Sequence, residues 1–387
     1  MINNLDISDF LKNYWQKKPL IIRSAFPCYQ SPVSADELAG LACEEFIESR
    51  IISENNTETK WQLEKGPFNE SRFTTLPETN WTLLIQGLNK IFPEFDDLLH
   101  QFNFIPSWRV DDLMASYAAP GGSVGPHLDQ YDVFLLQAQG TRKWMISEQA
   151  IEKDNFIENI PLKIIKDFTA ESEWILEAGD MLYLPANVAH YGIGIENCMT
   201  FSVGFRAPSY ADLISSFIDD QVTDIPDTMR YHDPELSADA NPGEITPAAI
   251  NNVQEILLSQ LKDKSKVEDW FGRFITDYLN DNAYLEENSL STNEFLSEFK
   301  INGYLRRPAT VRANYLSNKN HTIHLYINGA QFKYRKNTEQ VVKLFCNQHV
   351  IGFTNTEALV QEPNNLALLC ELYNRGYLEF SDEQNKN

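Results

Sequence analysis

The sequence predicts an α+β protein with a double-stranded β-helix in its first half and helices in its second. Residues 106–208 hold alternating and fully apolar runs of strand length, separated by glycine-rich turns, as in a β-barrel or jelly roll. Beyond Pro208 the apolar residues recur at helical spacing, and the C-terminal part mixes both patterns. A chain of 387 residues is too long for one ordinary core. We therefore expect three parts, 1–208, 209–282 and 283–387.

The N-terminal residues 1–105 predict a mixed α/β entry to this barrel. A short helix is expected at Ile7–Tyr14, and the stretch Trp15–Arg23 then turns into a strand. Ser34–Cys43 begins with a serine followed three residues later by a glutamate, a capping-box pattern that predicts a helix. Apolar residues at helical spacing predict a further amphipathic helix over Trp81–Ile91.

The barrel strands are expected in the region that follows. Two alternating segments, Leu113–Ala118 and Asp132–Gln137, flank a glycine-rich bend. Both faces of the second segment are largely apolar, which predicts a strand buried on both sides. Further strands are expected at Arg142–Ile146 and Thr200–Arg206. This strand count matches a double-stranded β-helix, the cupin-type jelly roll.

Three side chains of this region have the residue types of a metal site. His127 and Asp129 are two residues apart, so on a strand their side chains would share one face and reach a single point. His190 follows a Gly-Asp turn, a short apolar strand and a proline, and would add a second imidazole from a distant strand. Two histidines and one carboxylate form the facial triad of non-haem Fe(II) oxygenases, with open coordination positions. The alternative is a surface His-x-Asp turn and a satisfied core histidine.

Residues 209–282 predict helices. Leu213–Ile218 carries one apolar stripe, and Thr246 with Pro247 has the residue types of an N-cap and first helical position. The helix that follows is expected to point five residues inward: Ile250, Val253, Ile256, Leu257 and Leu261. The next stripe comprises Val267, Trp270, Phe271, Phe274, Ile275 and Tyr278. These stripes are either core or a helical dimer surface, and we favour a homodimer because a short helical segment has few other places to bury them.

Residues 283–387 predict a small α+β domain. Its expected elements are helices near Thr292–Phe299, Glu339–Cys346 and Asn364–Asn374, strands at Thr310–Tyr315, Ile323–Ile327 and Tyr377–Phe380, and a hairpin turn at Asn328-Gly329. The final helix–helix–strand order resembles a winged helix. The region lacks a dense basic helix, so we expect protein contact or a structural role and no direct nucleic-acid binding.

Charge and composition restrict the partners and the compartment. A net charge of −23 argues against binding to phosphate surfaces, and is compatible with a basic protein partner. The N-terminus lacks the pattern of a signal peptide, and no apolar run is long enough for a membrane span. Five scattered cysteines without C-x-x-C spacing indicate reduced, buried thiols. We therefore expect a cytoplasmic protein.

With these motifs in hand, the chain resembles the JmjC-type ribosomal oxygenases of the cupin superfamily, and most of all their bacterial branch. The resemblance covers essentially the whole chain and is carried by Trp15–Pro19, Asp111–Met114, Val124–Phe134 and Ser202–Pro208. It implies a JmjC barrel, a helical dimerisation segment and a C-terminal winged-helix domain. It also implies Fe(II)- and 2-oxoglutarate-dependent hydroxylation of an arginine side chain, at C3, in a basic large-subunit ribosomal protein.

The resemblance also implies roles for single residues. Three side chains would hold the Fe(II): His127, Asp129 and His190. Arg142 occupies the family position that grips the far carboxylate of 2-oxoglutarate, and Ser116 matches a position that adds a hydroxyl donor. The alternative for Arg142 is a surface strand arginine beside Lys143, with which it must alternate faces. Near the metal residues, three candidates for holding the substrate side chain are Tyr131, Asp132 and Gln137.

Two other functions are compatible with the same residues. A hydroxylase of another protein or small molecule, or a demethylase, would use the same triad, because demethylation needs only that the hydroxylated carbon be attached to nitrogen. A non-catalytic cupin that binds a ligand or partner is disfavoured by the presence of all three ligand residues and a suitably placed arginine.

Overall fold

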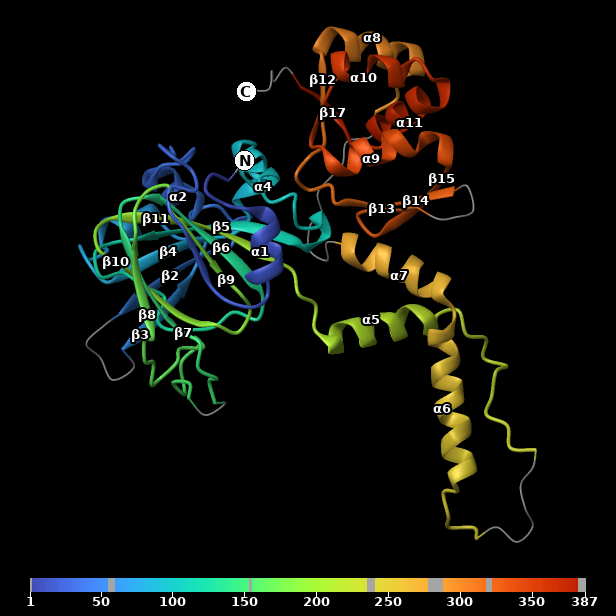
Figure 1. Cartoon of the computed structure of the whole chain (residues 1–387), viewed down its shortest axis with the longest axis horizontal. Coiled ribbons are helices and arrows are strands. Elements are labelled where there is room, and N and C mark those ends of the chain that lie inside the picture. Colours follow the sequence, from blue (N-terminus) through green and yellow to red (C-terminus); the bar gives the residue numbers. More distant parts are fainter. Residues whose placement is uncertain are drawn as a thin grey trace. The chain divides into compact units, whose positions relative to one another are not determined.

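The computed structural model describes residues 2–54, 60–152, 155–234, 241–277, 288–317 and 322–381. The chain divides into two compact units, Met1–Ala207 and Pro208–Asn387. The first unit is built on two antiparallel sheets, and the second combines helices with two small sheets (Figure 1). Among the described helices, none is both long and apolar enough to cross a membrane.

The first unit is the predicted double-stranded β-helix. Its larger sheet has the strand order β1-β9-β6-β11-β5-β4-β2-β3, and its smaller sheet has the order β10-β7-β8. The larger sheet contains β1 (Leu20–Ile22), β2 (Ser49–Glu54), β3 (Trp61–Lys65), β4 (Trp81–Ile85), β5 (Val110–Ala118), β6 (Asp132–Gln139), β9 (Met181–Leu184) and β11 (Cys198–Phe205). The smaller sheet contains β7 (Arg142–Ser147), β8 (Ser172–Leu176) and β10 (Ala189–Gly194). Strands far apart in sequence are therefore neighbours, which lets distant residues share one cavity.

Helices cover the outer face of the larger sheet. They are α1 (Ile7–Asn13), α2 (Ala35–Leu41), α3 (Glu70–Thr74) and α4 (Glu94–His100), with single turns η1 (Leu88–Lys90) and η2 (Ser107–Arg109). Phe10 of α1 packs on Phe134 of β6, and Phe95 of α4 packs on Phe201 of β11, with ring centroids 5.4 and 4.9 Å apart. This aromatic layer holds the larger sheet rigid from outside. The capping box predicted at Ser34 is present at the start of α2.

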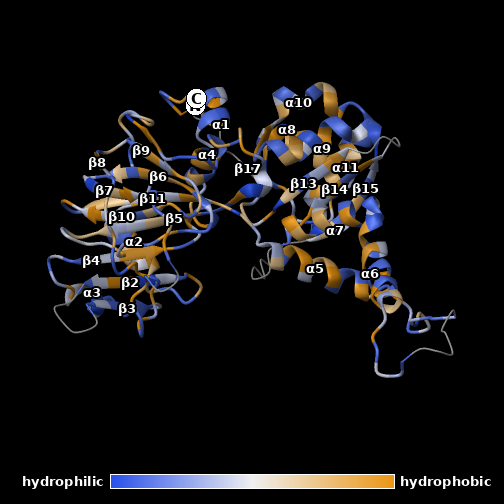
Figure 2. Ribbon diagram, turned by 60° about the horizontal axis from the view of Figure 1, so that its bottom comes forward, coloured by the Kyte–Doolittle hydropathy of each residue, from blue (hydrophilic) through white to orange (hydrophobic). Residues whose placement is uncertain are grey.

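Strand β6 is buried on both faces, as predicted. Phe134 and Leu136 belong to the outer core, whereas Val133 and Leu135 point into the barrel beside Trp144. The hydrophobic colouring of the central strands in Figure 2 follows from this double burial. A strand enclosed in this way has little freedom to move, so it is a stable support for a site.

The predicted helix over Trp81–Ile91 is wrong. Trp81–Ile85 forms β4, which pairs with both β2 and β5. Gly87 then adopts a φ of +70°, a conformation that a helix cannot contain, and only the short turn η1 follows. The apolar run fits both periodicities over five residues, and the neighbouring strands decide between them.

The expectation of buried thiols is wrong at Cys28, and Cys43 is only half-buried. All five cysteines are free, but Cys28 is exposed, in a turn where its φ is +56°. Cys198, Cys346 and Cys370 are buried.

The second unit begins with three helices, α5 (Tyr210–Val222), α6 (Pro247–Lys262) and α7 (Lys264–Thr276). Thr246 caps α6, as predicted, because its hydroxyl accepts a hydrogen bond from the Ala249 amide at 3.2 Å. Trp270 of α7 packs edge-on against Phe217 of α5, with ring centroids 5.2 Å apart. Gly272 of α7 lies against the ring of Tyr326, which joins this helix to the sheet below it.

The prediction that the α6 stripe points inward is wrong within a single chain. Its five residues, Ile250, Val253, Ile256, Leu257 and Leu261, are each between 47% and 61% exposed. Helical periodicity shows that one face is apolar, but it does not show what covers that face. Tyr278, predicted in the next stripe, lies outside the described residues.

The C-terminal part of the second unit has the mixed pattern predicted for a winged helix. Its elements are α8 (Thr292–Asn302), β12 (Tyr304–Arg306), β13 (Ala313–Ser317), β14 (Thr322–Ile327), β15 (Ala330–Arg335), η3 (Lys336–Thr338), α9 (Glu339–Asn347), β16 (Val350–Gly352), α10 (Phe353–Val360), α11 (Pro363–Asn374) and β17 (Glu379–Ser381). The predicted Asn328-Gly329 turn joins β14 to β15, and both residues have positive φ. The sequence patterns did not predict α10 or the strands β12, β15 and β16.

Candidate metal centre and cosubstrate pocket

The three predicted metal ligands come together in the first unit. His127, Asp129 and His190 each offer one ligand atom, and these atoms lie within 4.8 Å of one another. His190 Nε2 is 3.7 Å from Asp129 Oδ2, and the two imidazole centroids are 4.2 Å apart. Metal–ligand bonds of about 2.0–2.2 Å place two ligands of one ion up to roughly 4.4 Å apart. The three atoms can therefore bind one transition-metal ion with small side-chain adjustments.

The expected placement of His127 and Asp129 on a strand is wrong. Both residues lie in the connection between β5 and β6, and His127 makes only an isolated bridge to His190 of β10. The two backbones exchange hydrogen bonds of 3.0 and 2.8 Å. Pro126 has no amide hydrogen to donate and Gly125 has a φ of +81°, so a regular strand cannot form there. The bridge to β10, rather than strand periodicity, brings the ligands together.

Backbone carbonyls orient both imidazoles. His127 Nδ1 lies 2.9 Å from the Gly125 carbonyl oxygen, and His190 Nδ1 lies 3.0 Å from that of Val188. A carbonyl oxygen only accepts, so the proton sits on Nδ1 and the Nε2 lone pair is left for a metal. Burial and the neighbouring His127 lower the pKa of His190, which favours its neutral form. A neutral imidazole is the form that binds a metal ion.

These ligands open into a cavity of about 490 Å³ inside the barrel. Its lining includes the three ligands, Arg142 and Ser116, with Asp111, Asp112, Met114, Tyr131, Trp144, Leu162, Lys163, Ile164, Thr200 and Gly204 among the others. A single cavity thus joins the metal ligands to the residues that the sequence placed at the cosubstrate carboxylate.

Arg142 points into the barrel from β7. It is only 3% exposed, and its Nη1 donates hydrogen bonds to Ser116 Oγ at 2.8 Å and Thr200 Oγ1 at 3.1 Å. Lys143 faces outward and pairs with Glu173 at 2.6 Å, so the surface interpretation fits Lys143 and not Arg142.

The Arg142 guanidinium fits an anionic ligand. Among the described residues it makes no ion pair, its Nε has no hydrogen-bond partner, and burial lowers its pKa. Burying a cation without a counter-charge costs roughly several kcal/mol of free energy. This end of the cavity therefore attracts a carboxylate. The far carboxylate of 2-oxoglutarate meets that requirement, with the Ser116 and Thr200 hydroxyls beside it.

Thr200 was missed as a site residue. It lies on β11 directly opposite Ser116 of β5, and its hydroxyl donates a 3.0 Å hydrogen bond to Gln137 Oε1. The alternation of β11 places Thr200 on the inner face. Because every residue of β11 is buried, the sequence does not distinguish its inner face from its outer face.

Of the three candidates for the substrate side chain, only Tyr131 lines the cavity. Asp132 lies on the outer face of β6, where its carboxylate accepts hydrogen bonds from Tyr183 at 2.6 Å and Gln16 at 2.9 Å. Gln137 lies behind Thr200, at the Arg142 end. The prediction for Asp132 is wrong because β6 alternates and its even positions face out. Gln137 is at an odd, inward position, but it does not line the cavity, and its side chain bonds to the Thr200 hydroxyl and the Gln139 carbonyl.

Two further acidic side chains line the cavity beside Tyr131. Asp112 accepts a 2.7 Å hydrogen bond from Gln86 Nε2, and Asp111 precedes it on β5. Burial, and then the charge of Asp111, raise the pKa of Asp112. A Cβ added at Gly204 would lie 3.7 Å from the Tyr131 ring and 4.0 Å from Asp112 Oδ1. Gly204 thus lies next to both the aromatic ring and the carboxylate in the cavity wall.

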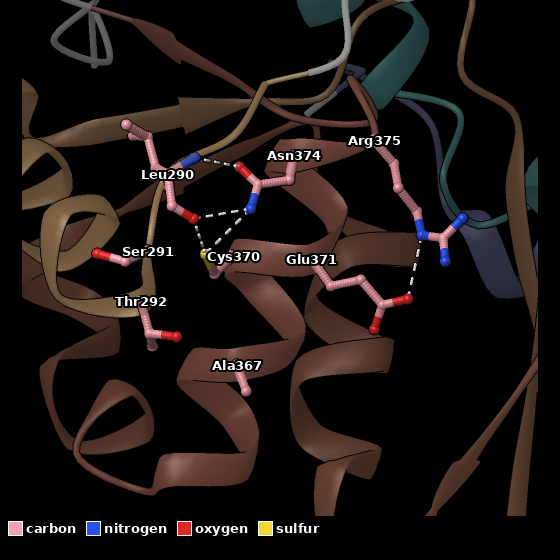
Figure 3. Close-up of a pocket in the computed structure, with 8 residues that line it drawn as sticks. All are labelled: Leu290, Ser291, Thr292, Ala367, Cys370, Glu371, Asn374 and Arg375. Atoms are coloured by element: carbon pink, nitrogen blue, oxygen red, sulfur yellow. Dashed lines mark hydrogen bonds and ion pairs between the residues drawn. The ribbon is translucent and has the colours of Figure 1, made fainter.

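The second unit has a separate, open hollow between the start of α8 and α11 (Figure 3). Its polar groups bond to one another: Cys370 and Asn374 donate to the Leu290 carbonyl, and Arg375 donates to Glu371 at 3.1 Å. These contacts leave no buried polar group in it aimed at a ligand, as far as the described residues go.

Comparisons with known proteins agree with this geometry. Residues 97–213 match the model of the JmjC domain, and residues 259–379 match that of the ROXA-like winged helix. The ribosomal protein uL16 3-hydroxylase of Escherichia coli (strain K12) is 33% identical, over 97% of this chain and 98% of its own length. A probable ribosomal oxygenase of Haemophilus influenzae is 32% identical, over 71% of this chain and 69% of its own.

Solved structures extend the likeness to the whole fold. The X-ray structure of E. coli ycfD superposes with a TM-score of 0.86 and 33% identity, covering 98% of this chain and 99% of that one. The ribosomal oxygenase YcfD from E. coli in complex with cobalt and 2-oxoglutarate gives a TM-score of 0.83 and 34% identity over 97% and 98% of the two chains. Together, the barrel, the triad and this near full-length likeness mean that the chain belongs to the JmjC-domain ribosomal oxygenase family.

Proposed function

We propose that this chain is an Fe(II)- and 2-oxoglutarate-dependent oxygenase that hydroxylates an arginine side chain, at C3, of a large-subunit ribosomal protein. One observation carries the proposal. The three candidate ligands and the buried Arg142 open into one cavity, in a chain 33% identical over nearly its full length to a uL16 3-hydroxylase.

His127, Asp129 and His190 would hold the metal ion. Bound Fe(II), with 2-oxoglutarate and dioxygen, supplies the oxidising power that puts one oxygen atom into a C–H bond and leaves succinate and carbon dioxide. The carbonyls of Gly125 and Val188 would accept from Nδ1–H of the two imidazoles and so leave each Nε2 for the ion.

Arg142 would fix the far carboxylate of the cosubstrate. Its guanidinium can donate two parallel hydrogen bonds to that carboxylate, and the Ser116 hydroxyl can add a third, whereas the Thr200 hydroxyl proton is donated to Gln137. Trp144 stands behind it, with its ring centre 5.5 Å from the guanidinium carbon. This apolar wall excludes water and strengthens the charge pairing.

The opposite side of the cavity would receive the substrate side chain. Asp112 offers a half-buried carboxylate to a guanidinium, and Tyr131 and Met114 offer apolar surface to its methylene groups. Burial disfavours the charged form of Asp112 and so raises its pKa. A substrate cation beside this carboxylate would offset that electrostatic cost. Gly204 lines the cavity beside Tyr131 and Asp112.

The partner and assembly follow from charge and exposed surface. A net charge of −23 attracts a basic ribosomal protein over long range and does not favour nucleic acid. The exposed apolar stripe of α6 supports contact with a second copy of the chain, which would make a homodimer. Three functional parts, 1–208, 209–282 and 283–387, would then serve catalysis, dimerisation and a winged-helix role, in the cytoplasm where ribosomes are assembled.

A coupled assay tests the reaction. Purified protein with Fe(II), 2-oxoglutarate and a uL16-type peptide should form succinate and a stable +16 Da product in equal amounts, with the added mass on an arginine. Formaldehyde release from a methylated peptide would instead indicate a demethylase. No succinate under any condition would leave a non-catalytic cupin.

A further inference from the structure

A hairpin between β7 and β8 covers one side of the metal centre. The Ile157 amide donates to the Ile164 carbonyl at 2.9 Å, and Phe156 bridges Ile165. Asn155 closes the open end, because its carbonyl accepts from the Lys166 amide and its side-chain oxygen accepts from the Asp167 amide. Residues 155–168 therefore form a defined structure, which we name the 155–168 hairpin.

This hairpin is attached to the segment that carries the first metal ligand. The Ile165 amide donates a 2.7 Å hydrogen bond to the carbonyl of Pro126, the residue before His127. The Ile164 side chain is 2% exposed and packs on Gly125: a Cβ built there would lie 2.9–3.2 Å from three of its carbon atoms. The Gly125 carbonyl is the acceptor that orients the His127 imidazole.

The hairpin also contacts the strand of the other histidine. At its end, Phe168 packs edge-on against Tyr191, with ring centroids 6.0 Å apart, and Tyr191 follows His190 on β10. Leu162 and Ile164 line the cavity itself. The 155–168 hairpin thus contacts both ligand-bearing segments and forms part of the cavity wall.

We propose that Ile164 is a positioning residue for the metal centre: it presses on Gly125 and so holds the carbonyl that fixes the His127 imidazole. The inference rests on the proposed function, because it concerns the metal that His127, Asp129 and His190 would bind.

The physical reason lies in the backbone at Gly125. Gly125 has a φ of +81° and no side chain, and its amide donates a 3.0 Å hydrogen bond to Ser123 Oγ, so the carbonyl side of the residue depends on packing. Ile164 supplies the missing packing. If it is shortened, the Gly125 peptide gains freedom, the Nδ1–H contact of His127 weakens, and Nε2 is aimed less well. Loss of such a support typically weakens metal binding about 10–100-fold.

The test is cobalt affinity of the full chain, measured by calorimetric titration well below the melting temperature of each variant. Ile164→Ala should bind Co(II) roughly 10-fold more weakly and consume more 2-oxoglutarate per hydroxylation. Ile157→Ala is the matched control: the same residue type, in the same hairpin and hydrophobic cluster, but outside the cavity lining. It should leave cobalt affinity within about twofold. The Ile164→Val variant, which keeps most of the packing, should shift affinity by only about two- to threefold.

The outcomes separate the two claims. Equal cobalt affinity in the parent, Ile164→Ala and Ile157→Ala would overturn the role of Ile164 while leaving the metal site. An equal loss in both alanine variants would also overturn it, since it would reflect general loosening. If Ile164→Ala fails to fold, the comparison of Ile164→Val with Ile157→Val decides, and equal affinities reject the proposal. A parent chain that binds no Co(II) would instead reject the proposed function.

Discussion

Arg142 and Ser116 belong to different sheets of the barrel, yet Arg142 Nη1 donates a 2.8 Å hydrogen bond to the Ser116 hydroxyl inside it. The contact spans the cavity from β7 to β5 and holds the guanidinium in a fixed place. Thr200 completes the arrangement from β11. A cation held this way, without a counter-charge among the described residues, is pre-organised to receive a carboxylate.

Replacing Arg142 should therefore weaken cosubstrate binding. In Arg142→Leu the KM for 2-oxoglutarate should rise about 10–100-fold, because hydrogen bonds to charged groups contribute about 1.5–3 kcal/mol. Cobalt affinity, measured alone, should stay near that of the parent. Lys143→Leu is the control, since that side chain faces outward to Glu173 and should leave the KM unchanged. Equal effects of both variants would contradict this assignment.

Replacing Asp112 should act on the other side of the cavity. In Asp112→Asn the KM for a uL16-type peptide should rise about tenfold or more, because a charge-assisted hydrogen bond to the substrate is lost. The KM for 2-oxoglutarate should stay unchanged, the reverse of the pattern expected for Arg142→Leu. A peptide KM equal to that of the parent would remove Asp112 from the substrate site.

The pH dependence of the peptide KM should report the same carboxylate. The pKa of Asp112 is raised by burial and, secondarily, by Asp111. Its charge is present above that pKa and lost as the pH falls through it, so the peptide KM should rise on the acid side, at a higher pH than for an ordinary aspartate. Asp111→Asn removes one cause of the raised pKa and should move this rise to lower pH. A shift to higher pH, or no shift, would contradict the account.

Asp132 should matter for stability rather than for the substrate. Asp132→Ala removes the acceptor of Tyr183 and Gln16 and leaves Arg109, 3.4 Å away, without this partner. Urea unfolding should show a loss of about 3 kcal/mol, because buried donors are left unsatisfied. The peptide KM of the folded variant should not change. An unchanged unfolding free energy with a raised KM would restore Asp132 to the substrate site.

The α6 stripe should decide the oligomeric state. Leu257→Glu places a charge in the middle of the exposed apolar face and should shift the chain from dimer to monomer in sedimentation equilibrium. Glu255→Lys is the control, since it changes charge on the opposite side of the helix, where Glu255 pairs with Lys262. A parent that sediments as a monomer would contradict the dimer.

Residue type and order were enough to predict much of the fold and the three residues that meet at the candidate metal site. The barrel strands, the capping box at Ser34 and the Asn328-Gly329 turn depend on local patterns that the chain alone specifies. The triad was selected by residue type, although its geometry depends on the bridge between His127 and His190 and not on a strand.

The predictions that failed concern residues whose structure depends on contacts with distant parts of the chain. Trp81–Ile85 became a strand because β2 and β5 lie on either side of it. Asp132 was misplaced because strand β6 is apolar on both faces, so the sequence does not distinguish its inner side from its outer side. Gln137 does face inward, but its hydrogen bonds to Thr200 and Gln139 could not be predicted from the sequence. The contact of Thr200 with Arg142 and the packing of Ile164 on Gly125 each join segments that are far apart in the chain. No local sequence pattern indicates such contacts.

The most direct test is mass spectrometry of large-subunit ribosomal proteins from a strain lacking this protein, incubated with enzyme, Fe(II), 2-oxoglutarate and oxygen. We predict a +16 Da gain on one arginine-containing peptide, with fragment ions placing it at C3 of the arginine, and no gain with the His127→Ala variant. Succinate formation without any modified ribosomal peptide would contradict the ribosomal substrate. A gain that persists in His127→Ala would contradict the metal centre itself.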